Sequence, residues 1–201
     1  MRETRVRTRE VRVLLIIPNG DDNHMKIYTA RGDKGGTDLL GERVTKADPR
    51  IDLLGELDEA TSSIGFARSL STWQNANNLL LTAQKDLYQI MAELAFIDTT
   101  RPDTLLFTAE RVDWLEATIA TIQESVPMQR EFVVVGESTP GAAMDVARTV
   151  VRRAERRAVT VAQELGAISN GQILRYLNRL STLLFILARA EDGHIVIAKE
   201  R

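Results

Sequence analysis

The chain has 201 residues, of which 44% are hydrophobic and 27% are charged, and its formal net charge is −2. This composition is typical of a globular protein with one domain, and the nearly neutral charge argues against a dedicated nucleic-acid binder. The sequence has no cysteine and two histidines near opposite ends, which excludes disulfides and argues against a histidine-rich metal site. No apolar run approaches the length of a membrane span, and these facts fit a cytoplasmic protein.

Residues 1–24 are rich in arginine and contain a short apolar run from Val13 to Ile17. The run is short for a secretory signal and is not followed by a cleavage site of small residues, and two glutamates argue against an organellar transit peptide. An edge strand over residues 5–13 is an alternative. We expect residues 1–24 to be an N-terminal extension that activity does not need, and residues 25–201 to form a single domain.

A glycine-rich loop follows a short extended run at residues 27–29. Gly32 and Gly35 let the backbone turn tightly and approach a ligand closely, and the N–H groups exposed in such a turn can bind an anion. Lys34 adds a positive charge and Thr37 adds a hydroxyl group. The spacing is not that of a P-loop, and a plain surface turn is the alternative when the loop is taken alone.

Three helices with an apolar face are predicted next, over residues 51–70, 75–97 and 108–125. We assign their apolar faces to the core. Asp58 lies on another face of the first helix, where it is either a solvated charge or the partner of an arginine. A short apolar run over residues 132–136 predicts a strand-like connector, and its position makes Phe132 available to line a pocket.

The fourth predicted helix is rich in arginine, and we place its N-cap at Thr139. Charged residues recur along it at spacings of three or four: Arg148, Arg152, Glu155 and Arg156. Residues at this spacing share one face, and Arg153 and Arg157 lie beside it. Guanidinium groups fixed on a helix suit carboxylate or phosphate oxygens, while a solvated face with local Arg–Glu pairs is the alternative.

The last predicted helix spans residues 171–189 and is capped by Ser169 or Asn170. Asn178 and Ser181 interrupt its apolar pattern. Such a polar pair often forms a hydrogen bond between helices, and it can equally bind the polar edge of a ligand. A short strand is expected after this helix, over residues 195–197.

Eight short segments stand in a specific order: Lys26-Ile-Tyr-Thr29, Gly32-Asp-Lys-Gly35, Asp48-Pro-Arg50, Gly55-Glu-Leu-Asp-Glu59, Ile64-Gly65, Ala147-Arg148, Arg152-Arg-Ala-Glu-Arg-Arg157 and Tyr176-Leu-Asn-Arg-Leu-Ser181. In this order and approximate spacing they resemble the PduO-type ATP:cob(I)alamin adenosyltransferases. The resemblance spans residues 26–189 and is carried only by helix pattern between about 70 and 130. It implies an all-α fold, a five-helix bundle of ferritin-like up-and-down arrangement, preceded by a short extended phosphate-binding segment. It also implies a homotrimer with active sites between neighbouring subunits.

The resemblance implies transfer of the 5′-deoxyadenosyl group of ATP to cob(I)alamin, with release of triphosphate. Co(I) is itself a strong nucleophile, so a protein nucleophile is not needed. The protein must align C5′ with cobalt and stabilise the negative charge that grows on the triphosphate, with Mg²⁺ as a helper. The implied partners are a cob(II)alamin reductase and an adenosylcobalamin-dependent enzyme, and we expect neither a nucleic acid nor a membrane as partner.

The resemblance further implies which residues bind ATP. The phosphates would be wrapped by the glycine-rich segment, through Tyr28, Thr29, Gly32, Asp33, Lys34, Gly35 and Thr37. Arg152 and Arg156 would hold ATP, and Glu155 would orient them or a metal-bound water. Asn178 would contact the nucleoside, with Ser181 nearby.

Four residues are implied as catalytic: Arg152, Asp58, Arg148 and Phe132. Asp58 of one subunit would pair with Arg148 of the next, which shapes the site and couples it to assembly. Phe132 would bind cobalamin and exclude its lower axial ligand, which makes Co(II) easier to reduce.

The sequence departs from the family pattern at several positions. Ala30 and Arg31 stand where a lysine and then a threonine or asparagine are usual, and residues 134–137 replace the usual Leu-Pro-Gly-Gly. Asp145 stands where histidine is usual, and Thr182 where aspartate is common. The changes at 134–145, Val135 among them, lie on the cobalamin side, so they bear on corrinoid affinity more than on ATP binding.

Three interpretations compete. The enzyme is favoured because the glycine loop, the arginine helix and the Asn-Ser pair occur together. An ATP- or corrinoid-binding sensor or carrier of the same fold without turnover is the alternative, motivated by the changes on the cobalamin side. A helical-bundle interaction protein with an acidic partner explains neither the glycine loop nor Asn178.

Overall fold

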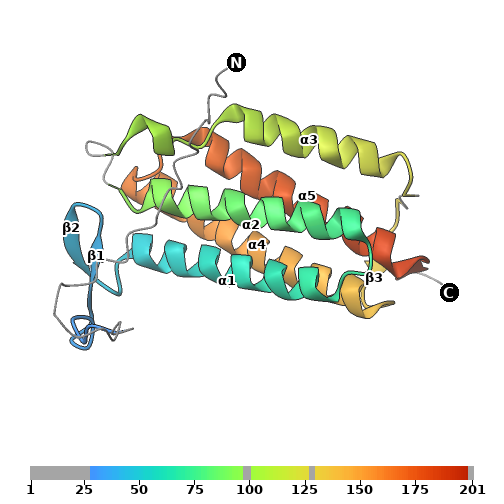
Figure 1. Cartoon of the computed structure of the whole chain (residues 1–201), viewed down its shortest axis with the longest axis horizontal. Coiled ribbons are helices and arrows are strands. Elements are labelled where there is room, and N and C mark those ends of the chain that lie inside the picture. The colour runs from blue at the N-terminus through green and yellow to red at the C-terminus, as the bar shows by residue number, and fades with distance from the viewer. Residues whose placement is uncertain (1–27, 97–100, 127–129, 199–201) are drawn as a thin grey trace, which may run out of the picture.

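The computed structural model describes residues 28–96, 101–126 and 130–198. In this part of the chain five α-helices lie side by side and successive helices run in opposite directions (Figure 1). They are α1 (Pro49–Leu70), α2 (Gln74–Leu94), α3 (Ala109–Gln123), α4 (Thr139–Leu165) and α5 (Gly171–Asp192). The predicted all-α five-helix bundle is therefore confirmed. The expected extension over residues 1–24, and the alternative strand within it, lie outside the described residues and stay predictions.

Side-chain caps set where three of these helices begin. Asp48 Oδ1 accepts from the backbone N–H of Arg50 at 2.9 Å before α1. The side chain of Arg50 also donates to this carboxylate, and those hydrogen bonds lower the pKa of Asp48. Ser138 Oγ accepts from Gly141 N at 3.0 Å before α4, so the predicted cap at Thr139 is wrong by one residue. Asn170, one of the two expected candidates, caps α5.

The core is built from the apolar faces that the sequence predicts. Each helix contributes fully buried residues, such as Leu57, Leu87, Leu115, Val151 and Leu184. Helix α4 packs against both α1 and α5, and α5 also packs against α3. Burial of apolar surface between these helices stabilises the bundle. Helix α4 is central to it, because two of its faces pack against neighbouring helices.

Two pairs of short strands lie at opposite ends of the bundle (Figure 1). The antiparallel hairpin β1 (Gly36–Leu39) and β2 (Glu42–Thr45) projects past the end where α1 begins, and sequence reasoning did not expect it. At the other end β3 (Val133–Val134) pairs with β4 (Val196–Ile197), which confirms the expected connector and tail strand.

Candidate active site

The arginines of α4 point to two neighbouring helices. Arg153 contacts Glu56, with Nε to Oε2 at 2.6 Å, and also Glu59, while Arg157 contacts Asp52. These five residues form a row of ion pairs that we call the α1–α4 seam. The two glutamates raise the pKa of Arg153 above its usual value. The guanidinium groups of the seam are therefore engaged by carboxylates of the same chain.

A hollow of about 350 Å³ opens on the other side of α4, and we call it the α4–α5 hollow. It is lined by Arg152, Glu155, Arg156, Val159 and Asn178. Arg152 and Arg156 are exposed, and neither has an ion pair within the described part of the chain. Arg156 Nη1 donates to the carbonyl of Arg152, at 3.1 Å. The structure thus brings together four residues that the resemblance implies for ATP, with two cations free to meet an anion.

The amide of Asn178 is held in one orientation in this hollow. Its Nδ2 donates to Glu155 Oε1 at 2.8 Å, and its Oδ1 accepts from Arg179 Nη1 at 2.9 Å. A carboxylate can only accept and a guanidinium can only donate, so the amide cannot flip. Arg179 is anchored in turn, because its Nε donates to Glu116 Oε1 at 3.0 Å. Sequence reasoning gave Arg179 no role, because its partner Glu116 lies on a different helix.

Ser181 does not line the α4–α5 hollow. It is 6% exposed, and its hydroxyl donates to the backbone carbonyl of Asn178 at 2.8 Å. The residue lies on the buried side of α5, one turn from Asn178. Its contact with ATP stays a prediction.

The glycine-rich segment forms a tight, exposed turn. The N–H groups of Asp33 and Gly35 donate to the carbonyls of Ala30 and Gly32, at 3.3 and 3.1 Å. Ala30 and Gly35 have positive φ values of 58° and 78°, a backbone region that glycine adopts easily and alanine rarely. The carbonyl of Gly35 accepts from the N–H of Lys46 at 2.8 Å, which ties the turn to the end of β2.

Several polar groups of this segment remain exposed: Tyr28, Thr29, Asp33 and Lys34. Thr37 lies in β1, opposite Val44. Arg31, which stands beside the position where the family has lysine, lies 3.9 Å from Asp38. A basic side chain is therefore present one position after the lysine of the family. It lies close to an acidic side chain of the same hairpin, Asp38.

Within one chain, the glycine-rich turn and the α4–α5 hollow, both predicted to bind ATP, lie far from each other. The hairpin projects past the end of the bundle in Figure 1, near the end of α4. Arg152 lies halfway along α4, about 20 Å from that end at 1.5 Å per residue. In this chain the glycine-rich turn therefore lies beyond the end of the bundle and the α4–α5 hollow lies halfway along it.

The other predicted catalytic residues are also dispersed. Phe132 is 83% exposed and lies next to β3, at the end of the bundle opposite the hairpin. Asp58 is exposed on α1 and has no ion pair among the residues that the structure describes. Arg148 Nε donates to Asp145 Oδ1 at 2.7 Å within the same chain. Asp145 itself is 3% exposed, so it is a buried residue and not an open corrinoid contact.

A buried polar group stands behind the wall of the hollow. The hydroxyl of Tyr176 donates to Asp86 Oδ2 at 2.7 Å, and Arg111 Nη2 contacts the same oxygen at 2.6 Å. Burial raises the pKa of Tyr176 well above its usual value, and Asp86 raises the pKa of Arg111. These three residues link α5, α2 and α3. Because Tyr176 lies two residues before Asn178, the link fixes the part of α5 that faces the hollow.

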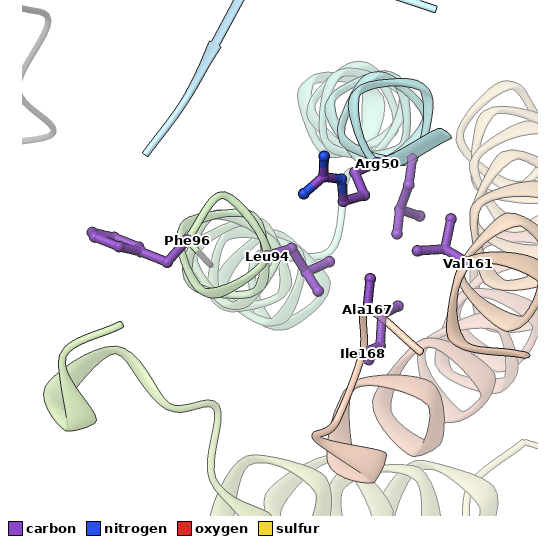
Figure 2. Close-up of a pocket in the computed structure, with 7 residues that line it drawn as sticks. Arg50, Leu94, Phe96, Val161, Ala167 and Ile168 are labelled. Atoms are coloured by element: carbon purple, nitrogen blue, oxygen red, sulfur yellow. The ribbon is translucent and has the colours of Figure 1, made fainter. Parts of the chain in front are cut away.

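A second, smaller cavity of about 120 Å³ lies between the ends of α1, α2 and α4 (Figure 2). Leu53, Leu94, Val161 and Ile168 give it mainly apolar walls. Its one cation, Arg50, is engaged by Asp48 and Glu42, at 2.7 and 2.5 Å. We assign this cavity no chemistry.

Residues 28–96, 101–126 and 130–198 contain neither a cluster of metal ligands nor a helix suited to a membrane. No group of three or more histidine, aspartate or glutamate side chains in these ranges could hold a metal ion. No helix described here combines the length and the hydropathy that crossing a bilayer requires.

The sequence model of the cobalamin adenosyltransferase family matches residues 27–191. The chain belongs to this family. It is 38% identical over 170 residues to the corrinoid adenosyltransferase PduO of Citrobacter freundii, which covers 84% of this chain and 50% of that protein. It is 39% identical over 175 residues to the corrinoid adenosyltransferase of Bacillus subtilis, with 84% of this chain and 88% of that protein covered. The chain thus spans about half the length of the PduO relatives that it matches, and most of the Bacillus protein.

Solved structures of family members have the same fold. One is the PduO-type ATP:corrinoid adenosyltransferase from Lactobacillus reuteri, complexed with cobalamin and ATP, in a variant with histidine in place of a phenylalanine. It superposes with a TM-score of 0.80 at 32% identity. That match covers 87% of this chain and 97% of the other. An arginine-to-lysine variant of the same protein, complexed with ATP, gives a TM-score of 0.74 at 32% identity and covers 86% of this chain and 100% of the other. The family and the fold expected from the resemblance are confirmed.

Proposed function

We propose that this cobalamin adenosyltransferase family member transfers the 5′-deoxyadenosyl group of ATP to cob(I)alamin, giving adenosylcobalamin and triphosphate. The observation that carries the proposal is the α4–α5 hollow, where two arginines that have no carboxylate partner in the described part of the chain flank an amide of fixed orientation. Triphosphate is a strong anion and a nucleoside is a polar, planar group, and this lining suits both. The Lactobacillus reuteri relative, a variant of which is complexed with cobalamin and ATP, supports the same assignment.

The chemistry needs charge and alignment rather than a protein nucleophile. Cobalt of cob(I)alamin supplies the electron pair that forms the Co–C5′ bond, and the C5′–O bond breaks with its electrons on the leaving triphosphate. Arg152 and Arg156 would stabilise the negative charge that develops there, where donors fixed in advance are most effective. Glu155 is the carboxylate best placed to hold Mg²⁺ on the phosphates, since only its Oε1 is engaged by Asn178. Mg²⁺ would add further positive charge at the same place.

We also propose that the working unit is a homotrimer with active sites between neighbouring subunits. The separation of the glycine-rich turn from the hollow supports this, because a second copy can bring its turn to the hollow of the first. Asp58 supports it as well. Its neighbours Glu56 and Glu59 face α4 of the same chain, while Asp58 points to another side of α1 and is free to pair with Arg148 of a neighbour.

Phe132 fits a corrinoid contact, because a large aromatic side chain that is 83% exposed is available to a neighbouring copy or to a ligand. We propose that it excludes the lower axial ligand of cobalamin. The further proposals that follow from the family are a cytoplasmic location, a reductase that supplies the Co(I) state, and an adenosylcobalamin-dependent enzyme that receives the product.

The test is an anaerobic spectrophotometric assay of the full chain with chemically reduced cob(I)alamin, with and without MgATP. ATP-dependent conversion to adenosylcobalamin with stoichiometric triphosphate is the expected result. Saturable ATP binding by calorimetry without conversion would contradict turnover and favour a sensor or carrier. Deletion of residues 1–24 in the same assay is expected to leave the rate unchanged.

A further inference from the structure

A cluster of buried charges joins the start of α4 to the end of α5. Arg189 Nη2 lies 2.5 Å from Asp145 Oδ2 and 2.7 Å from Asp192 Oδ2, and Arg189 Nε donates to Asp192 at 3.0 Å. The side chains of these three residues are 1–4% exposed. Together with Arg148 we call them the Asp145 cluster. Charges this deeply buried are stable only when each is paired.

Arg148 completes the charge balance of this cluster. Its Nε donates to Asp145 Oδ1 at 2.7 Å, so Asp145 uses one oxygen for Arg148 and the other for Arg189. Two arginines then face two aspartates. Without Arg148 the buried part would hold one positive and two negative charges, and Asp145 would lack half of its partners.

The cluster holds Arg148 by one edge only. The side chain of Arg148 is 23% exposed, and its two Nη groups have no hydrogen-bond partner among the described residues. Its guanidinium also lies 5.9 Å from the ring centre of Phe185, whose ring is 5.2 Å from the guanidinium of Arg189. One nitrogen is therefore fixed from inside the protein, while the other two stay available on the surface.

Asp192 ties the same cluster to the first turn of α4. Its Oδ1 accepts from the N–H and the hydroxyl of Ser138, the cap of this helix, at 3.1 and 2.9 Å. A Cβ atom at Gly141 would lie 2.0 Å from this oxygen, so glycine is required there. The start of α4, and with it the position of Arg148, is thus fixed by the end of α5.

We infer that Asp145 is a positioning residue for assembly: it fixes Arg148 through Nε and presents the two Nη groups to a carboxylate of a neighbouring copy. The inference rests on the proposed function, in which that carboxylate is Asp58. A surface ion pair usually contributes little, because two long side chains must be ordered to form it. Anchoring Arg148 from inside removes most of that cost before the subunits meet. Asp145 thereby acts on the intersubunit contact without touching the neighbour.

The test compares two aspartates that are matched in burial and that are both paired with arginine. Asp145 is 3% exposed and accepts from two guanidinium groups, while Asp86 is 4% exposed and accepts from the guanidinium of Arg111 and the hydroxyl of Tyr176. An Asp145→Asn variant replaces one of the two accepting oxygens by an NH2 group that can only donate, so one of the two arginines loses its acceptor. Asp86→Asn is the control for a buried defect away from Arg148. The readout is the concentration at which the oligomer dissociates, measured by sedimentation velocity, together with turnover at high and low protein concentration.

We expect Asp145→Asn to raise the dissociation concentration roughly tenfold, with turnover restored at high protein concentration. Asp86→Asn is expected to lower the urea midpoint without moving the dissociation concentration. Equal dissociation concentrations in the two variants would show that Asp145 is only structural. Wild-type protein that stays monomeric and inactive would instead overturn the proposed assembly itself, so the two failures are distinguishable.

A second variant keeps the inference testable should Asp145→Asn not fold. Arg148→Lys retains the positive charge for Asp58, but a single ammonium group cannot bind Asp145 and a neighbour in the geometry of a guanidinium fork. We expect it to dissociate at about tenfold higher concentration than the wild type. An Arg148→Lys protein that assembles as tightly as the wild type would overturn the inference.

Discussion

The two sides of α4 differ in what lies opposite their arginines. Arg153 and Arg157 face three carboxylates of α1 in the α1–α4 seam, and their charge is neutralised inside the chain. Arg152 and Arg156, each one position earlier in sequence, line the α4–α5 hollow with no carboxylate partner among the described residues. One residue along a helix is a rotation of about 100°, so neighbours in sequence belong to different surfaces.

This difference shows that the availability of an arginine on α4 depends on the side chains of the neighbouring helix. Paired guanidinium groups on the surface add little to stability and are not available to a ligand. Unpaired ones next to a fixed amide are available to an anion, as proposed for ATP. The comparison can be tested by substituting residues of the α4–α5 hollow and of the α1–α4 seam in turn.

The largest effect is expected from Arg152→Ala. Loss of one fixed donor to the leaving triphosphate should lower kcat/KM for ATP by about 10²- to 10³-fold, which is roughly 3–4 kcal/mol of transition-state stabilisation. The urea midpoint should stay close to that of the wild type, because the side chain is exposed and makes no ion pair in the described part of the chain. Anaerobic kinetics and urea unfolding measure both. Near-wild-type turnover by the folded variant would remove Arg152 from the site.

A smaller effect is expected when the anchor of Asn178 is removed. Arg179→Met frees the amide to flip, and we expect KM for ATP to rise about tenfold, near 1.4 kcal/mol, with a smaller change in kcat. Arg175→Met is the matched control, because Arg175 also contacts Glu116, at 3.4 Å, but not Asn178. The same rise in KM in both variants would mean that only the charge near Glu116 matters.

The support behind the hollow is tested by pH. The pKa of Tyr176 is raised in the folded protein, so its contribution to stability is complete below the unfolded value of about 10 and is lost as pH rises from there toward the folded pKa. Tyr176→Phe should be about 1 kcal/mol less stable than the wild type at pH 8. The gap should shrink by about 1 kcal/mol at pH 10.5, as judged by urea unfolding. A gap that does not change with pH would contradict a buried, neutral phenol.

The smallest effect is expected on the seam. Arg153→Ala removes the contacts with Glu56 and Glu59, yet turnover and KM for ATP should stay within about twofold of the wild type. The urea midpoint should fall only slightly, because these pairs are open to solvent. A loss of activity close to that of Arg152→Ala would erase the distinction between the two sides of α4.

Sequence reasoning predicted the helices well and their contacts poorly. The apolar periodicity of residues 51–70 and 171–189 reflects burial on one side, so it located α1 and α5 to within three residues at each end. The hairpin of β1 and β2 was missed, because its four-residue strands bury only Leu39 and are held by a bond from Leu40 N–H to the carbonyl of Ala95. That partner is distant in sequence.

For the site, residue type and spacing were informative, but pairing was not. Arg152, Glu155, Arg156 and Asn178 were predicted together, and the structure brings them into one hollow. Asp145 was interpreted as a change on the corrinoid side, yet it is buried between Arg148 and Arg189. Arg189 lies 44 positions away at the far end of another helix, and nothing local in either segment indicates the contact.

By itself, then, the sequence determined the class of fold, the positions of the helices, the family and the face of α4 that carries its arginines, because periodicity and local motifs are properties of neighbouring residues. Only the tertiary structure decided which arginines are neutralised, which way the amide of Asn178 points and where the charge of Asp145 is used. Those outcomes depend on which side chain lies across from another at 2.5–3 Å, and that is set when distant helices pack.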